Sequence, residues 1–294
     1  MAQKKTAKNR PIPTEIRIHF MASDPLANER YFMSGLALIF SNLLILLSVL
    51  TLLWALSVRI KDASIVDIFW GPACALPAIL TYLRMDGAAP RDFLLTGLVS
   101  VWAARLALYL GRRNLGHGED YRYVKMRQRQ GSDKAMARWS LYRVFWLQGL
   151  IAWTVSIPVQ LGQFGPEGLS FIAYIGAALF VIGLLFETIG DAQLTAFKAK
   201  PENKGKLMTQ GVWAITRHPN YFGDAAVWSG LAIIALESPL GGWAFISPIV
   251  MTFFLYAVSG KALTEKHMRA KYPEYSEYVG RVSGFIPWFP RKAS

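Results

Sequence analysis

The feature that most constrains this chain is a series of apolar runs, each about twenty residues long, the length that spans the hydrocarbon core of a bilayer as an α-helix. Runs such as GLALIFSNLLILLSVLTLLWAL show no alternation with a period of two, so they exclude a transmembrane β-barrel. Helices remain as the membrane-spanning elements. Hydrophobic residues make up 53% of the chain, too many for a soluble surface to hide, which excludes an ordinary soluble enzyme.

Seven apolar runs predict an all-α integral membrane protein with seven transmembrane helices. A polar arm over 1–31, which lacks the apolar stretch of a signal peptide, is expected to precede a single seven-helix domain over 32–294. No internal repeat is visible in the sequence. The predicted spans are 32–58, 63–83, 93–110, 141–161, 169–189, 221–238 and 243–260.

The basic residues predict how the chain is oriented. With seven crossings, 22 Lys and Arg residues fall on one side of the membrane and 8 on the other. The richer side is expected to be cytoplasmic, which places the N-terminus outside and the C-terminus inside. We therefore expect an integral membrane protein whose active site opens to the cytoplasm. Its cytoplasmic parts would be loops 111–140 and 190–220 and a tail over 261–294.

The net charge of +13 also points to an anionic partner: nucleic acid, lipid head groups or a phosphate-bearing small molecule. In GRRNLGHGEDYRYVKMRQRQ and TRHPNYFGD the basic residues are mixed with aromatic, amide and acidic residues, which suits a polar small ligand. A bundle in a bilayer offers no open groove for a polymer, so we expect membrane lipid as a partner and no nucleic acid. The single cysteine, Cys74, excludes an intramolecular disulfide, and no Cys/His spacing indicates a metal.

Ionisable residues within the predicted spans are the next signal, because each costs roughly 2.5–3.5 kcal/mol unless it faces the bundle interior or a cavity. Four of them stand out: Asp67, Arg105, Glu187 and Asp224. Polar groups that converge from several helices predict a ligand site, and buried ion pairs, such as Asp67 with Arg105, are the alternative. Helical spacing groups the polar residues by face as Arg105, Tyr109 and Arg112, then Glu187 and Asp191, then Asn220 and Asp224.

The chain has none of the glycine-rich phosphate motifs of soluble enzymes, so a nucleotide would have to be held by side chains and helix ends. The stretch QGVWAITRHPNYFGD, residues 210–224, suits that role. Pro219 is expected at the first position of a helix, where unpaired backbone N–H groups of residues 220–222 would face an anion beside Arg217 and His218. The alternative is a capped helix start without a ligand.

These stretches belong to a set that resembles a known family, the bacterial DUF1295 proteins of the membrane steroid 5α-reductase-like group. The resemblance covers about 67–290, and sterol reductases and isoprenylcysteine carboxyl methyltransferases share its later part. It implies an enzyme of the bacterial inner membrane, and the upstream segments favour a reductase. The segments are DIFWG (67–71), ALYLGRRN (107–114), ETIGDAQLTAFK (187–198), TQGVWAITRHPNYFGD (209–224) and EYSEYVGRVSGFIPWFP (274–290).

The resemblance implies roles for individual residues. Asp67 and Tyr109 match the positions that approach the substrate carbonyl in steroid 5α-reductases and are expected to be catalytic, with Val66 where the family has Gln. The residues expected to hold the cofactor combine matched family positions with basic side chains that would clamp phosphates. They are Arg105, Arg112, Glu187, Asp191, Lys198, Arg217, His218, Asn220, Tyr221, Asp224, Lys261 and Glu265.

The implied chemistry is that of an oxidoreductase acting on a C=C bond. NADPH would reduce an apolar enone that enters from the bilayer, and the family suggests a 3-oxo-Δ4 steroid. Tyr109, hydrogen-bonded to Asp67 in a dry cavity, would donate the proton. Two alternatives stay open: a membrane S-adenosylmethionine-dependent methyltransferase, whose cofactor has no phosphate, and a non-catalytic transporter or lipid-binding protein.

Overall fold

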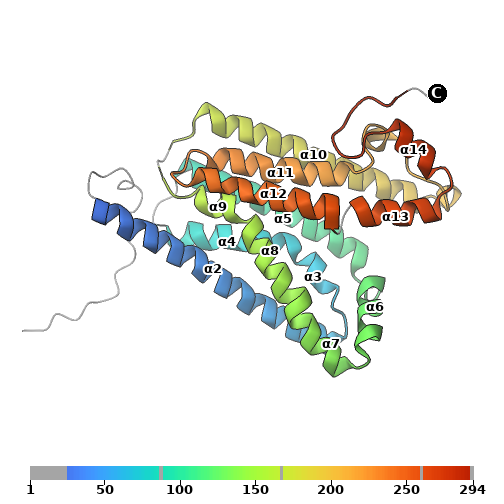
Figure 1. Cartoon of the computed structure of the whole chain (residues 1–294), viewed down its shortest axis with the longest axis horizontal. Coiled ribbons are helices and arrows are strands. Elements are labelled where there is room, and N and C mark those ends of the chain that lie inside the picture. Colours follow the sequence, from blue (N-terminus) through green and yellow to red (C-terminus); the bar gives the residue numbers. More distant parts are fainter. Residues whose placement is uncertain (1–24, 86–88, 166–167, 259–260, 292–294) are drawn as a thin grey trace, which may run out of the picture. The chain divides into compact units, whose positions relative to one another are not determined.

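A computed structural model of the chain describes residues 25–85, 89–165, 168–258 and 261–291 (Figure 1). Within these ranges the secondary structure is helical and no strand occurs. The predicted arm over 1–31 lies mostly outside the described residues, and helix α2 already begins at Pro25. Contacts divide the chain into two compact units, each described by itself below, and the single domain over 32–294 stays a prediction. The first unit comprises 1–153, 160–169 and 237–239, and the second 154–159, 170–236 and 240–294.

Among the described residues, three helices are long and apolar enough to cross a membrane. In α2 (Pro25–Ile60) the apolar stretch is Met33–Ile60, whereas α5 (Pro90–Asn114) and α10 (Phe171–Ala199) qualify over their whole length. They correspond to three of the seven predicted spans. The described part of the chain is therefore all-helical with three clear candidate spans, and seven crossings and the orientation stay predictions.

The other four predicted spans form shorter or interrupted helices. Proline explains one interruption: Pro158 has no N–H to donate to the preceding turn, so the helix breaks near Ser156 and restarts with Pro158 in a first turn, where proline is tolerated. The elements that replace these spans are α3 (Ile65–Ile68) with α4 (Trp70–Arg84), a π-helix (Leu141–Trp146) with α8 (Leu147–Val155) and α9 (Ile157–Leu161), α11 (Pro219–Ala235), and a 3-10 turn (Gly241–Phe245) with α12 (Ile246–Phe253) and a π-helix (Phe254–Val258).

In the first unit α4 packs against both α2 and α5. The backbone of α4 approaches α5 closely at Gly71, where an added Cβ would lie 2.8 Å from the carbonyl oxygen of Ala103. A buried amide links α2 to its neighbours: Asn42 Nδ2 donates to Thr81 Oγ1 at 2.9 Å and to Gln160 Oε1 at 3.0 Å. Such pairing lowers the cost of polar groups inside an apolar bundle.

The segment predicted as cytoplasmic loop 111–140 is largely helical. Helix α5 continues to Asn114, and α6 (Tyr121–Gln130) and α7 (Asp133–Ser140) follow. The Asp120 side chain accepts from the backbone N–H of Arg122 and caps the start of α6, which is a preferred role of aspartate. Hydropathy alone did not distinguish this pair of polar helices from a loop.

In the second unit α10 and α11 lie side by side (Figure 1). Gly176 and Gly183 of α10 face Gly230 and Gly223 of α11, and a Cβ added at Gly176 would lie 2.6 Å from the carbonyl oxygen of Gly230. Only glycine permits two helix backbones to approach so closely, so this pattern sets the register of the pair. Two turns further along, Gly190 of α10 packs against the ring of Pro219 at the start of α11.

The predicted loop 190–220 and tail 261–294 also contain regular structure. Helix α10 runs on to Ala199, and two 3-10 turns follow, Pro201–Asn203 and Gly211–Ala214. The tail forms α13 (Lys261–Lys271) and α14 (Tyr275–Arg281), and the buried Tyr275 and Tyr278 of α14 pack with Met268 of α13 and with Leu207. These elements enclose the candidate site.

Candidate functional site

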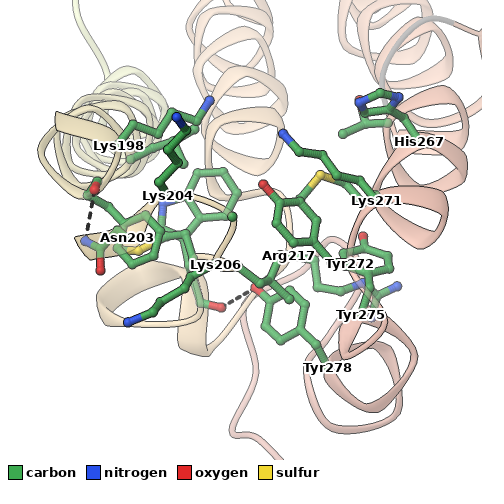
Figure 2. Close-up of a pocket in the computed structure, with 18 of the residues that line it drawn as sticks. Lys198, Asn203, Lys204, Lys206, Arg217, His267, Lys271, Tyr272, Tyr275 and Tyr278 are labelled. Atoms are coloured by element: carbon green, nitrogen blue, oxygen red, sulfur yellow. Dashed lines mark hydrogen bonds between the residues drawn. The ribbon is translucent and has the colours of Figure 1, made fainter. Parts of the chain in front are cut away.

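A pocket of about 620 Å³ lies within the second unit, a size typical of small-molecule sites (Figure 2). The end of α10, the 199–213 segment, the start of α11, α13 and α14 line it. Its basic lining residues are Lys198, Lys200, Lys204, Lys206, Arg217, His218, His267 and Lys271. Among its described lining residues there is no aspartate or glutamate. Its aromatic lining residues are Phe197, Trp213, Tyr221, Tyr272, Tyr275 and Tyr278.

The lysine-rich side of the pocket comes from the sequence KAKPENKGK, residues 198–206. Pro201 cannot continue α10, and the Asn203 side chain donates to the carbonyl of Phe197 at 2.9 Å, which satisfies the last turn of that helix. Gly205 then adopts a φ of +82°, a left-handed conformation that favours glycine. A short turn therefore gathers four lysines at one edge of the pocket.

Unlike the lysines on the turn, Arg217 is held by buried contacts. Its Nη2 and Nε atoms donate to Glu265 Oε1 at 2.9 and 3.1 Å, and its Nη1 donates to the carbonyls of Val279 and Val282. His218 Nε2 lies 3.2 Å from the same Glu265 oxygen. Both side chains are nearly inaccessible, so Glu265 of α13 fixes the position of two residues that line the pocket.

The charge of Glu265 is set by two opposing effects. Burial pushes the pKa of its carboxyl up, but the hydrogen bonds and charges of Arg217 and His218 together outweigh burial and hold the pKa below its ordinary value. Glu265 is therefore ionised at neutral pH. Glu265 was expected among the cofactor residues but does not line the pocket. Its Oε1 atom instead contacts both Arg217 and His218, which do line it.

The start of α11 is confirmed at Pro219, but its backbone is less open than expected. The N–H of Tyr221 donates to Asn220 Oδ1 at 3.1 Å, and the N–H of Phe222 donates to the carbonyl of His218 at 3.0 Å. The expectation of unpaired N–H groups at 220–222 is wrong for these two, because the chain caps its own helix. Side chains therefore carry more of any ligand recognition at this end than the sequence predicted.

Aromatic rings make up much of the pocket wall. His218 stacks on Tyr221, with ring centroids 5.1 Å apart and planes 2° from parallel. Burial raises the pKa of Tyr275 to about 12, so this hydroxyl is neutral and available as a donor at neutral pH. Tyr278 donates to the carbonyl of Trp213 and ties α14 to the 3-10 turn across the pocket. Flat rings held in this way offer stacking surfaces to a ligand.

The structure brings five of the predicted cofactor residues to the pocket lining: Lys198, Arg217, His218, Asn220 and Tyr221. Glu187 and Asp191 share a buried face of α10, as expected, and lie beside α11, but they are not among the lining residues. Asp224 lies one turn into α11 and is also outside the lining. The side chain of Lys261 lies outside those that the structure describes. Arg105 and Arg112 belong to the first unit and are not among the lining residues.

The two predicted catalytic residues, Asp67 and Tyr109, both lie in the first unit, but they are not hydrogen-bonded to each other. The Asp67 carboxylate instead accepts from Arg122 Nη2 at 2.6 Å and from the Tyr123 hydroxyl at 2.7 Å. The expected bond to Tyr109, and the alternative ion pair with Arg105, are therefore wrong for Asp67. The reason is that α6, which the sequence prediction left as a loop, brings its first turn to α3.

Tyr123, which donates to Asp67, and Tyr109 have different surroundings. Burial and the charge of Asp67 raise the pKa of Tyr123, so Tyr123 remains neutral and donates. Tyr109 has the guanidinium groups of Arg105 and Arg113 over its ring, 5.6 and 5.7 Å from the centroid. The expected arginine environment of Tyr109 is present, with Arg113 as the second neighbour where Arg112 was expected.

Sequence reasoning missed most of the lysines and tyrosines of the pocket. Lys200, Lys204, Lys206 and Lys271 counted only toward orientation, although four lysines within nine residues around Pro201 and Gly205 are a signal for a basic turn. Tyr275 and Tyr278 follow helical spacing, which was legible in the sequence, and Tyr272 lies between α13 and α14. His267 carried no signal of its own.

The family follows from a comparison with known proteins. The model of the family described as "Protein of unknown function (DUF1295)" matches residues 53–282. The chain belongs to this family. An uncharacterized protein of Schizosaccharomyces pombe is 26% identical over 268 residues, which cover 80% of this chain and 75% of that protein. A bacterial origin stays a prediction.

Relatives with named activities match shorter parts of the DUF1295 chain. Protein-S-isoprenylcysteine O-methyltransferase B of Arabidopsis thaliana is 28% identical over 125 residues, 40% of this chain and 60% of that enzyme. A Delta(14)-sterol reductase of Ascobolus immersus is 29% identical over 99 residues, 29% of this chain and 21% of that enzyme. The chain thus spans less than two thirds of either enzyme. No solved structure matches.

Proposed function

We propose that this DUF1295 protein is an NADPH-dependent membrane reductase that transfers hydride to the C=C bond of an apolar enone, with a 3-oxo-Δ4 steroid as candidate substrate. The observation that carries the proposal is the charge of the pocket. Five lysines line it and its described lining residues include no carboxylate, while the charge of Arg217 is paired with that of Glu265. Such a site attracts a ligand with several negative charges, and the three phosphates of NADPH provide them.

The residues of the pocket fit the parts of this cofactor. Figure 2 shows the amino groups of Lys198, Lys204 and Lys271 extending toward the same side of the pocket, where they would pair with phosphate oxygens. Tyr221 and Tyr272 offer ring faces on which a planar base can stack. The preference for NADPH over NADH would come from the surplus of lysines, because the 2′-phosphate adds charge that NADH lacks.

NADPH, when bound, would supply the hydride for the β-carbon of the enone. The protein then has to stabilise the enolate oxygen and provide a proton for the α-carbon. Tyr109 is the proposed donor, because Arg105 and Arg113 over its ring would stabilise the negative charge left on its oxygen. Asp67 acts in this proposal through its bonds to Arg122 and Tyr123, which fix α6 against α3, and so it is a positioning residue.

A second candidate is an S-adenosylmethionine-dependent methyltransferase. The named relatives include O-methyltransferases, and an aromatic wall can receive a sulfonium cation by cation–π attraction. The lysines argue against this candidate. S-adenosylmethionine has no phosphate to pair with them, and they would repel its positive sulfonium. The basic lining therefore favours the reductase.

Ligand binding by the purified full-length protein in detergent separates the two candidates. Isothermal titration with NADPH, NADH and S-adenosylmethionine should give binding in that order of affinity, with the last undetectable. Tight binding of S-adenosylmethionine without NADPH binding would reject the reductase. Turnover is then followed as loss of NADPH absorbance with a panel of 3-oxo-Δ4 steroids in liposomes. If NADPH binds and no steroid is reduced, the steroid assignment fails while the cofactor assignment holds.

A further inference from the structure

The last described residues form an exposed aromatic surface that the proposed reaction does not use. Residues 285–291, called the C-terminal finger here, carry Ile286, Trp288 and Phe289, whose exposed fractions are 65%, 69% and 83%. Three large apolar side chains that are close in sequence and this exposed are unfavourable in water. They call for an apolar surface to cover them.

The C-terminal finger has a fixed backbone. The N–H of Trp288 donates to the carbonyl of Ile215 at 2.9 Å, and the Thr216 hydroxyl donates to the carbonyl of Phe285 at 2.8 Å. At its far end the N–H of Arg291 donates to the carbonyl of Arg281 at 2.9 Å. Because these bonds hold the backbone in place, the local structure keeps the three side chains exposed.

The finger lies at the end of an apolar helical segment. Phe285 makes an edge-to-face contact with Tyr256, with centroids 6.0 Å apart. Tyr256 ends the apolar stretch Gly241–Ala257, and α13, rich in charged residues, follows it. Exposed aromatic residues at the boundary between apolar and charged helix are typical of the lipid–water interface.

Charge at the finger matches an anionic surface. Arg281 precedes it and Arg291 ends it, and both are exposed, Arg281 within a solvent-exposed ion pair with Glu277 at 3.4 Å that an anionic head group can replace. We propose that the C-terminal finger inserts Ile286, Trp288 and Phe289 into the lipid–water interface of the membrane, with the two arginines on anionic head groups. Apolar insertion combined with basic residues is an effective pairing for binding such membranes. The inference does not depend on which cofactor the pocket holds.

Depth measurement by spin labelling tests this in the full-length protein. Phe289→Cys carries the label in one sample and the matched control Ser276→Cys, exposed on α14 of the same unit, carries it in the other. The native Cys74 is fully buried, and the unmodified protein checks that it stays unlabelled. The protein is reconstituted in phosphatidylcholine–phosphatidylglycerol vesicles. Collisions of the label with oxygen, which concentrates in lipid, are compared with collisions with a water-soluble nickel chelate.

We expect the ratio of oxygen to nickel collisions at position 289 to exceed that at position 276 by several-fold. Equal ratios at the two positions would overturn the proposal, because the finger would then lie in water. Protection of position 289 from both reagents would also overturn it, since a protein surface would then cover the finger. Ile286→Cys repeats the measurement if Phe289→Cys does not fold.

Discussion

Gly183 and Gly223 meet backbone to backbone, so that a Cβ on either residue would fall 2.5 Å from the carbonyl oxygen of the other. No side chain fits between the helices at this point. The contact sets how far α10 and α11 are offset, and so it aligns the end of α10 with the start of α11, where the pocket forms.

Replacing Gly183 with alanine should therefore destabilise the protein by roughly 1–3 kcal/mol, because the backbones must separate to admit the methyl group. Thermal unfolding of the detergent-solubilised protein measures this. Gly97→Ala in α5 is the matched control, since a Cβ there would meet no atom within 4 Å. An equal melting temperature for the two variants would contradict the packing argument.

Glu265→Gln tests the buried contact with Arg217 and His218. The pKa of Glu265 is below its ordinary value of 4.5 in the folded chain, so its charge stabilises the fold above about that pH. This contribution is lost as the pH falls from 4.5 through the lower folded-state pKa. The wild type should then lose stability between neutral and acid pH more steeply than the variant, as melting temperature against pH would show. Parallel curves would mean that the contact adds nothing.

Lys271→Ala should weaken NADPH binding by about tenfold or more, the effect of losing one charge-assisted hydrogen bond. The loss should shrink at high salt, because salt screens an exposed charge. Lys266→Ala is the control, because Lys266 is exposed on the same helix but does not line the pocket. Titration of both variants decides the matter. A comparable loss of affinity in Lys266→Ala would show that the overall positive charge of the protein, and not the pocket, attracts NADPH.

Tyr109→Phe removes one hydroxyl and keeps the ring over which Arg105 and Arg113 lie. Enone reduction should fall by roughly 10²-fold if this hydroxyl donates the proton, while NADPH affinity stays unchanged. Steady-state turnover and titration on the same preparation give both values. Full turnover with a competent enone would exclude Tyr109 as the donor.

Tyr123→Phe leaves the Asp67 carboxylate with Arg122 as its remaining side-chain donor. The cost should be about 1–3 kcal/mol of stability, since a buried acceptor loses a partner. Melting temperature and turnover are compared with those of Tyr121→Phe, whose ring is exposed on the same helix. Because Asp67 is proposed to position α6, the two measures should fall together. Lost turnover at unchanged stability would point to a direct chemical role for the Asp67 and Tyr123 pair.

The sequence predicted the parts of this protein that depend on local pattern. Apolar length found α2, α5 and α10, and the position of proline found the start of α11. It did not find the break near Ser156, because an average over a window hides the effect of a single proline. Interrupted helices and long spans have the same composition, and only the hydrogen-bonding pattern separates them.

The site shows the same division. Arg217 and His218 were found because they adjoin a helix start in the sequence. The partner of Asp67 was missed because Arg122 and Tyr123 lie 55 and 56 residues away, on a helix whose polar face looks like a loop. Contacts over such separations depend on tertiary packing, which no local pattern encodes.

All lining residues of the pocket fall between 194 and 278, in one continuous stretch of the chain. Mutations elsewhere can therefore accumulate without altering the pocket wall directly, and selection can act on the two regions at different rates. A lineage that keeps this stretch can keep the pocket wall while the rest of the chain diverges.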